Sequence, residues 1–414
     1  MPLRPFLSRC VWPLMCALLA SCARPPAQEA SRGAPRAEPP LVATESLALP
    51  PSELETRLQQ LDAGWTEPFA SAAPAPPAPS GPLPYAALGD SLTAGMQAAG
   101  LTAATQYAAY PAQVAGLAGW AFGVPATRQG CPLPMGGGLE PGSCQRVTAE
   151  RVSNFAVPGA KVGDLTRTRG RDLGDELGRR MYGLILGPNQ TQVEAALTAQ
   201  PQRLTLWIGA NDVLPAVLQG DPSLVTPPKE FAEAYRRILQ DLQPLGAKTL
   251  LLTVPDVTQV PLMSPGPLLF RQGVAGADCQ RSENRLPLSA FLAGRPLSCA
   301  SGAALTPEES ARIQAVVRAY NESIYRLAAA YGCDVLEVRL LTEALDMHPA
   351  EDASSPDPFG ADISADGLHL SISGQRKLAH AVAGRMGQYW HEPFPGLTQR
   401  EHGGGEHSEA AQAR

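Results

Sequence analysis

A serine that follows a short apolar segment is the first candidate for chemistry in this chain. Residues 85–95 predict a buried strand that ends at Gly89-Asp90 and places Ser91 in a turn before a helix. A serine hydroxyl is a weak nucleophile, so catalysis would also need a base, a group that orients the base, and donors for an oxyanion. Taken alone, Ser91 is more simply explained as the N-cap of the following helix.

Two later segments contain groups that could stabilise negative charge on a reacting carbonyl oxygen. Residues 154–160 end in a Pro-Gly turn, where the N–H of Gly159 can face a cleft without a Cβ in the way. Asn211 follows the apolar segment 204–208 and can extend its amide NH₂ toward the same cleft. The alternative is that Gly159 is only a turn glycine and Asn211 only a loop residue.

Asp366 and His369 could supply the base and the group that orients it. They lie three residues apart, directly before the helix predicted over residues 373–390. His369 could take the proton of Ser91 and return it to a leaving alcohol, while Asp366 accepts from the other ring nitrogen and fixes the tautomer. Alternatively, His369 caps or packs at the start of the helix, or a backbone carbonyl orients its ring in place of Asp366.

Together these segments resemble the four signature blocks of the SGNH (GDSL) hydrolases, a family of esterases and lipases. The matching residues occur in the family's order within about residues 84–390: Gly89-Asp90-Ser91, Gly159, Gly209-Ala210-Asn211-Asp212 and Asp366-Gly367-Leu368-His369. The resemblance implies ester hydrolysis by a catalytic triad of Ser91, His369 and Asp366. The oxyanion hole would be formed by the backbone N–H groups of Ser91 and Gly159 and by the Asn211 side chain.

The other polar features suggest no further chemistry. Asp90 and Asp212 are expected to hold backbone amides and neighbouring loops. The sequence has no Cys-x-x-Cys pair, no His-Glu-x-x-His helix and no Gly-x-x-x-x-Gly-Lys loop, so we predict no metal and no other cofactor. Because the net charge is −6 and no run of five or more Lys or Arg occurs, nucleic acid is not an expected partner.

Five apolar segments of strand length alternate with helical segments. They are nearly continuous in apolar residues, as strands buried on both faces are: residues 85–88, 152–157, 204–208, 249–254 and 335–338. The clearest predicted helices are residues 229–245, 307–331 and 373–390. The alternation predicts a three-layer α/β/α sandwich around a mostly parallel, five-stranded sheet, and the resemblance implies the flavodoxin-like sheet of the SGNH hydrolases.

Two Gly/Pro-rich insertions interrupt the predicted hydrolase domain, residues 84–395. They lie near residues 122–145 and 259–305. Ligands of parallel sheets bind beyond the carboxyl ends of the strands. Because the second insertion directly follows a strand, we expect it to rise over the ligand-binding face.

Each insertion contains two cysteines. Pairing by proximity in sequence predicts the disulfides Cys131–Cys144 and Cys279–Cys299 and leaves Cys333 as a buried thiol. The alternatives are that all five are reduced or that they pair differently.

The N-terminal region predicts export and a lipid anchor. Residues 1–21 have the basic and short apolar parts of a signal peptide, and their end resembles a bacterial lipoprotein cleavage site with Cys22 as the acylated residue. The Pro/Ala-rich residues 22–83 predict a tether, and residues 396–414 a disordered tail. The alternative is an ordinary signal peptide cut near Ala20 or Ala23.

These features predict an exported serine esterase or lipase of a bacterial cell envelope. Its substrate would be an ester of a lipid, an acylated small molecule or a glycan, and Cys22 would hold it on a membrane. One alternative is the deacetylation of O-acetylated polysaccharide. The other is a non-catalytic, surface-binding lipoprotein on the same scaffold.

Overall fold

The structure, a computed structural model, describes most of the predicted hydrolase domain. The described residues are 81–98, 100–127, 130–131, 144–148, 151–289, 297–352, 355 and 357–397. The predicted signal peptide, Cys22, nearly all of the predicted tether and the tail beyond residue 397 lie outside them. Within the described ranges, no helix combines the length and the apolar composition needed to cross a bilayer.

A parallel sheet lies at the centre of the fold. Its strands follow the order β1-β2-β3-β6, and every neighbouring pair is parallel. Their bounds are β1 Ala86–Gly89, β2 Arg203–Trp207, β3 Lys248–Leu252 and β6 Asp334–Leu336. Four of the five predicted strands are therefore present, each within a few residues of its predicted position.

The remaining predicted strand, residues 152–157, forms only one parallel bridge, between Asn154 and Ala87 of β1. The N–H of Val157 also bonds to the C=O of Gly89. The N–H of Ala156 bonds to the side chain of Asn154 instead of a further strand, so this segment is the edge of the sheet. If residues 152–157 are counted as the second strand in the chain, the strand order is 2-1-3-4-5, as in flavodoxin. Because these residues do not form a full strand, the described sheet has four strands rather than the predicted five.

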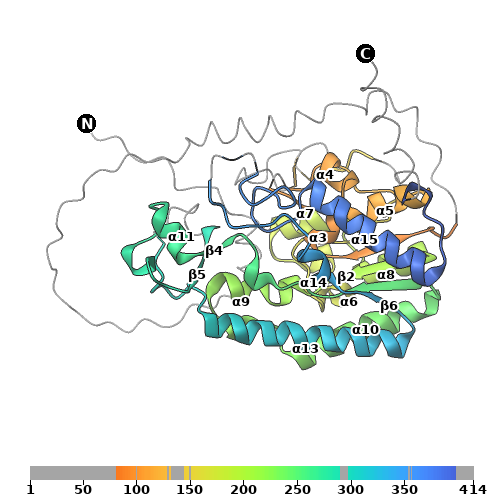
Figure 1. The fold of residues 1–414 in the computed structure, drawn as a ribbon. Helices are drawn as coiled ribbons and strands as arrows, with labels where there is room; N and C mark the ends of the chain where they lie inside the picture. The colour runs from red at the N-terminus through yellow and green to blue at the C-terminus, as the bar shows by residue number, and fades with distance from the viewer. Residues whose placement is uncertain are drawn as a thin grey trace, which may run out of the picture. The chain divides into compact units, whose positions relative to one another are not determined.

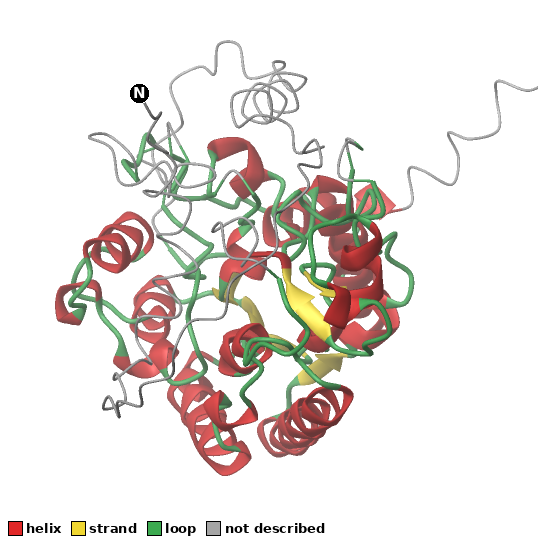
Figure 2. Cartoon of the chain, turned by 90° about the vertical axis from the view of Figure 1, so that its left-hand side faces the viewer, coloured by secondary structure: helices red, strands yellow, loops and turns green. Residues whose placement is uncertain are grey.

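Helices cover both faces of the sheet, which completes the predicted α/β/α sandwich (Figures 1 and 2). Helices α10 (Pro228–Leu242) and α13 (Pro307–Tyr331) pack together on one face, and α5 (Tyr110–Ala118) and α15 (Ile372–Trp390) on the other. Side chains of β1 alternate accordingly: Ala86 and Leu88 join the first core, and Ala87 joins the second. The α-helices are α3 Ser91–Ala94, α4 Ala103–Tyr107, α5 Tyr110–Ala118, α6 Asp164–Arg167, α7 Glu176–Ile185, α8 Gln192–Ala199, α9 Leu214–Gln219, α10 Pro228–Leu242, α11 Gly266–Arg271, α13 Pro307–Tyr331, α14 Val338–Thr342 and α15 Ile372–Trp390. Short 3-10 helices are η2 Gly170–Asp172, η3 Ala210–Asp212, η4 Pro222–Leu224, η5 Gln243–Leu245, η6 Val257–Gln259 and η7 Ala277–Cys279.

The longest helix, α13, occupies its predicted residues because its start is strongly specified. Thr306 and Glu309 bond to each other's backbone N–H groups in a capping box, and Pro307 fits the first helical position. Tyr320 then stacks on Phe231 of α10, with ring centroids 3.8 Å apart. This contact fixes α13 against α10.

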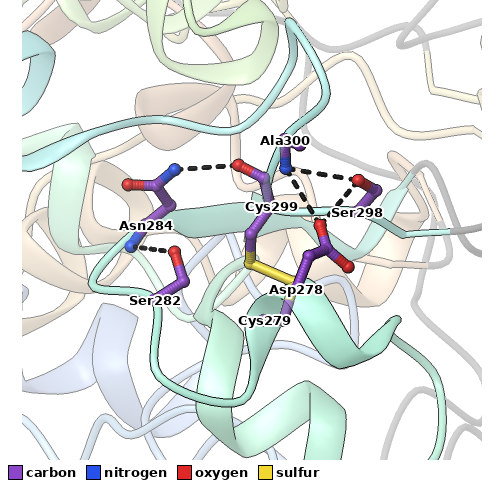
Figure 3. Close-up of a disulfide and its surroundings, with 7 residues drawn as sticks. All are labelled: Asp278, Cys279, Ser282, Asn284, Ser298, Cys299 and Ala300. Carbon is purple, nitrogen blue, oxygen red and sulfur yellow. Dashed lines mark hydrogen bonds between the residues drawn. A yellow bond between two sulfur atoms is a disulfide. The ribbon is translucent and has the colours of Figure 1, made fainter.

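The second insertion has its own small core around the disulfide Cys279–Cys299, whose Cα atoms lie 5.1 Å apart (Figure 3). It contains α11 and an antiparallel pair of strands, β4 Met263–Pro265 and β5 Arg285–Pro287. At its base, the N–H of Leu262 bonds to the C=O of Gly367, at 2.9 Å. The insertion is thereby joined to the segment that carries Asp366 and His369.

Both predicted disulfides are present. Cys131 and Cys144 pair with their Cα atoms 4.7 Å apart, although most residues between them lie outside the described ranges. Cys333 is a free thiol, as predicted, but it is half-buried rather than buried.

Candidate active site

Ser91, His369 and Asp366 form a hydrogen-bonded row in the structure. Ser91 is the first residue of α3, directly after β1, and His369 lies just before α15. The Oγ of Ser91 is 2.9 Å from the Nε2 of His369, and the Nδ1 of His369 is 2.7 Å from Oδ2 of Asp366. The structure thus brings together three side chains that the sequence placed at opposite ends of the domain.

Asp366 holds His369 through the backbone as well as the ring. Its Oδ1 accepts from the N–H of Leu368 and from the N–H of His369, each at 2.9 Å. The tight turn also requires Gly367 to adopt a φ of +69°, and a Cβ there would lie 2.9 Å from the N atom of Leu262. The partner of Nδ1 is the carboxylate, not a backbone carbonyl.

The charges in this row raise the pKa of His369 and so make its ring a stronger base. Burial lowers the pKa of His369, which is 7% exposed, but the negative charge and hydrogen bond of Asp366 and the charge of Asp90 raise it, so the pKa lies above its ordinary value. Burial raises the pKa of Asp366, but His369 outweighs this effect and holds the pKa below its ordinary value. The carboxylate therefore stays ionised, and His369 can act as a proton acceptor.

Ser91 is not the cap of α3. That place belongs to Asp90, whose Oδ1 accepts from the N–H of Leu92 at 3.0 Å. The capping alternative for Ser91 is therefore wrong, and its hydroxyl is free to bond to His369. Gly89 precedes this turn, and a Cβ there would lie 2.4 Å from the C=O of Trp207.

The two segments predicted to provide oxyanion donors lie next to each other. Gly159 has a φ of +82° in the turn that ends residues 152–157. Asn211, in η3, is 4% exposed, and its Nδ2 donates to the C=O of Ala160 at 3.0 Å. One amide N–H of Asn211 is used in this bond, and the other can donate to a ligand.

The aspartates beside the motifs hold backbone and loops, as predicted. Asp212 is fully buried, and its carboxylate accepts from the N–H of Val162 and from the hydroxyl of Thr226. Burial raises the pKa of Asp90 to about 7 and that of Asp212 to about 6. Their side chains therefore position the turns at a cost in charge burial.

No group of three or more His, Cys, Asp or Glu side chains suited to a metal ion occurs among the described residues.

The sequence analysis did not identify two buried glutamines, Gln192 and Gln375, that contact the turn around Ser91. The available signal was weak, since each is one polar residue within the first turn of a helix.

The site thus has a strand-end serine that is hydrogen-bonded to a histidine, whose other ring nitrogen bonds to a carboxylate, an arrangement typical of serine hydrolases. The family model described as GDSL-like Lipase/Acylhydrolase matches residues 85–382. The chain belongs to this family and is a carboxylic ester hydrolase.

Several solved structures are similar to this chain at low identity. The psychrotrophic esterase EstA from Pseudoalteromonas sp. is 12% identical, with 74% of this chain and 98% of that chain covered and a TM-score of 0.35. An acetylxylan esterase from Geobacillus stearothermophilus is 15% identical over 73% and 93%, with a TM-score of 0.36. An extracellular lipase from Streptomyces rimosus is 16% identical over 73% and 98%, with a TM-score of 0.32. No curated protein sequence matched, and the family assignment rests on the family model.

The buried carboxyl of Asp90 predicts a pH-dependent stability. Because its folded pKa is raised to about 7, the folded protein retains a proton that the unfolded chain has lost, so ionisation destabilises the fold as pH rises toward 7. Asp90→Asn removes this effect and keeps an acceptor for Leu92. From pH 5 to pH 8, the unfolding free energy of Asp90→Asn should rise by about 2–3 kcal/mol relative to wild type, measured by urea denaturation.

Asp221→Asn is a matched control for this measurement. Asp221 also accepts from a backbone N–H two residues later, that of Ser223, but its pKa is lowered by its hydrogen bonds to Ser223. The stability difference between Asp221→Asn and wild type should stay constant from pH 5 to pH 8. An equally constant difference for Asp90→Asn would contradict the prediction.

Proposed function

We propose that this esterase acts through an acyl-enzyme formed on Ser91. Ser91 Oγ attacks the ester carbonyl while His369 accepts its proton, and His369 then protonates the leaving alcohol. Water, deprotonated by His369, releases the acid in the second half of the reaction. The observation that carries this proposal is the hydrogen-bonded row from Ser91 Oγ through the imidazole of His369 to Asp366.

The oxyanion would be bound by the N–H groups of Ser91 and Gly159 and by the amide of Asn211. Three facts support this role: Gly159 has no Cβ, Asn211 is buried, and a bond to Ala160 fixes the Asn211 amide. A donor held in this way needs no reorganisation when charge develops, which is why one such group is worth about a hundredfold to a thousandfold in rate.

We also propose that the protein is exported and anchored to a membrane through an acylated Cys22, with residues 22–83 as tether. The two disulfides support export, because disulfides persist in oxidising compartments. Attachment by more than one acyl chain would make the anchor stable. The substrate would then be an ester of the cell envelope or its surroundings.

Replacement of Ser91 tests the nucleophile. Ser91→Ala should abolish labelling by a fluorophosphonate probe and lower kcat for p-nitrophenyl acetate and butyrate at least about a thousandfold, because within the described ranges the hydroxyl that bonds to His369 is that of Ser91. Ser301→Ala, at an exposed loop position, should label and react like wild type. Full labelling of folded Ser91→Ala would rule out this nucleophile.

The pH profile tests His369 and Asp366. Catalysis needs a neutral His369, so kcat/KM should fall as pH drops through a pKa above that of an ordinary histidine. Asp366→Asn removes the charge that raises this pKa, so the acid limb should move to lower pH while kcat falls on the order of a thousandfold or more. The two quantities come from kcat/KM and kcat, both measured between pH 5 and pH 9; an unmoved acid limb in Asp366→Asn would contradict the assignment.

Replacement of Cys22 tests the anchor. When the full chain is produced in a bacterial host, wild type should incorporate labelled palmitate and partition into the detergent phase. Cys22→Ala should do neither, while its esterase activity per molecule is unchanged. Retention of Cys22→Ala in the detergent phase would show that another feature attaches the protein.

A further inference from the structure

Helix α3, which begins with Ser91, is too short to provide hydrogen-bond partners for all of its backbone carbonyl groups. It spans only Ser91–Ala94, so its own turn cannot satisfy all of its carbonyl groups. Thr93 and Ala94 are buried and Ser91 and Leu92 are half-buried, so water has little access to the carbonyl groups at the end of this helix. Because an unpaired buried carbonyl is costly, donors from elsewhere in the fold must meet these groups.

Two side-chain amides supply the missing donors. The Nε2 of Gln375 donates to the C=O of Leu92 at 3.0 Å, and the Nδ2 of Asn154 donates to the C=O of Thr93 at 2.8 Å. Gln375 is fully buried and Asn154 is 3% exposed. Neither amide touches the hydroxyl of Ser91, so both act on its backbone.

Gln375 connects the nucleophile to the base. It lies in the first turn of α15, which begins at Ile372, only three residues after His369. The Oε1 of Gln375 accepts from the N–H of Tyr110 at 2.8 Å, so α5 fixes the carboxamide from its other end. A single side chain thus ties the residue after Ser91 to the helix that follows His369.

We propose that Gln375 is a positioning residue of the ester hydrolysis, which sets the separation of Ser91 Oγ from His369 Nε2. This inference rests on the catalytic roles proposed above for Ser91 and His369. The 2.9 Å contact between them joins two segments far apart in the chain. Gln375 belongs to the helix that follows His369, and its hydrogen bond holds the carbonyl of Leu92, the residue after Ser91. A misplacement of about 1 Å in such a pair can cost about a hundredfold in rate.

The glutamine at position 192 fixes the other side of the same turn. Its Oε1 accepts from the N–H of Gly89 at 2.9 Å, and its Nε2 donates to the C=O of Gly89 at 2.8 Å. Gln192 is fully buried at the start of α8. With Gly89 fixed in this way, loss of the Gln375 bond would let α3 move relative to α15 rather than release the whole turn.

Gln375→Met tests the proposal, because methionine has a similar volume and offers no N–H donor. We expect kcat to fall about 10-fold to 100-fold, with KM changed less than about twofold, since Gln375 does not touch the hydroxyl that attacks the substrate. The rate of inactivation by the fluorophosphonate should fall with kcat. Urea denaturation reports how much stability the same change removes.

Gln106→Met is the matched control. Gln106 is also a buried glutamine, 2% exposed, and its Nε2 donates to the C=O of Pro125 at 3.0 Å. It should lose stability with kcat unchanged. If Gln375→Met, when folded, keeps wild-type kcat, or if Gln106→Met loses as much kcat, the proposal is overturned.

Gln375→Glu provides a second readout that a packing role would not move. Glutamic acid can donate to the C=O of Leu92 only when protonated, so the ratio of its kcat to that of wild type should rise as pH falls. The corresponding ratio for Gln375→Met should be independent of pH, and a flat ratio for both variants would count against the donor role. A fully active Ser91→Ala would instead refute the catalytic roles beneath the proposal, which keeps the two failures distinct.

Discussion

The parallel pairing of β1 with both of its neighbours is the constraint on which the site depends. Gly89, the last residue of β1, is in register with Trp207 of β2, and its C=O accepts from Val157 on the other side. Three parallel segments therefore end at the same level, and the turns that follow them meet at one edge of the sheet. One turn provides a hydroxyl, one a backbone N–H and one a carboxamide. The loop before α15 adds the imidazole of His369 and the carboxylate of Asp366.

The same edge concentrates buried polar groups, and their interactions serve more than one purpose. Asp90 caps α3 through Leu92, and its charge also raises the pKa of His369. Asp212 ties the Asn211 turn to Val162, close to the turn that carries Gly159. Since an unsatisfied buried polar group costs about 1–3 kcal/mol, each of these bonds limits how far a turn can move. The folding of the turns and the geometry of the site therefore depend on the same contacts.

Most of the scaffold and the central row of side chains could be predicted from the sequence, because they depend on local signals. Apolar strands ending in Gly-Asp-Ser or Gly-x-Asn-Asp give positions to within a few residues, and the Thr306 capping box fixes α13. The prediction of a fifth strand at residues 152–157 was incomplete, because pairing on one side only leaves the edge segment with a single bridge. Gln192 and Gln375 gave no usable signal, since their partners are backbone groups distant in sequence.

The amides of Asn154 and Gln375 follow from a general consequence of placing Ser91 at the start of a very short helix. Such a position exposes the hydroxyl at the strand end, yet it leaves buried carbonyls without partners within the helix. Donors must then come from neighbouring segments, and the nearest segments at this edge are those that carry the other site groups. Asn154 lies on the segment that ends at Gly159, and Gln375 lies on the helix that follows His369. The hydrogen bonds that satisfy the carbonyl groups of α3 thus connect the segments whose relative positions the proposed chemistry requires.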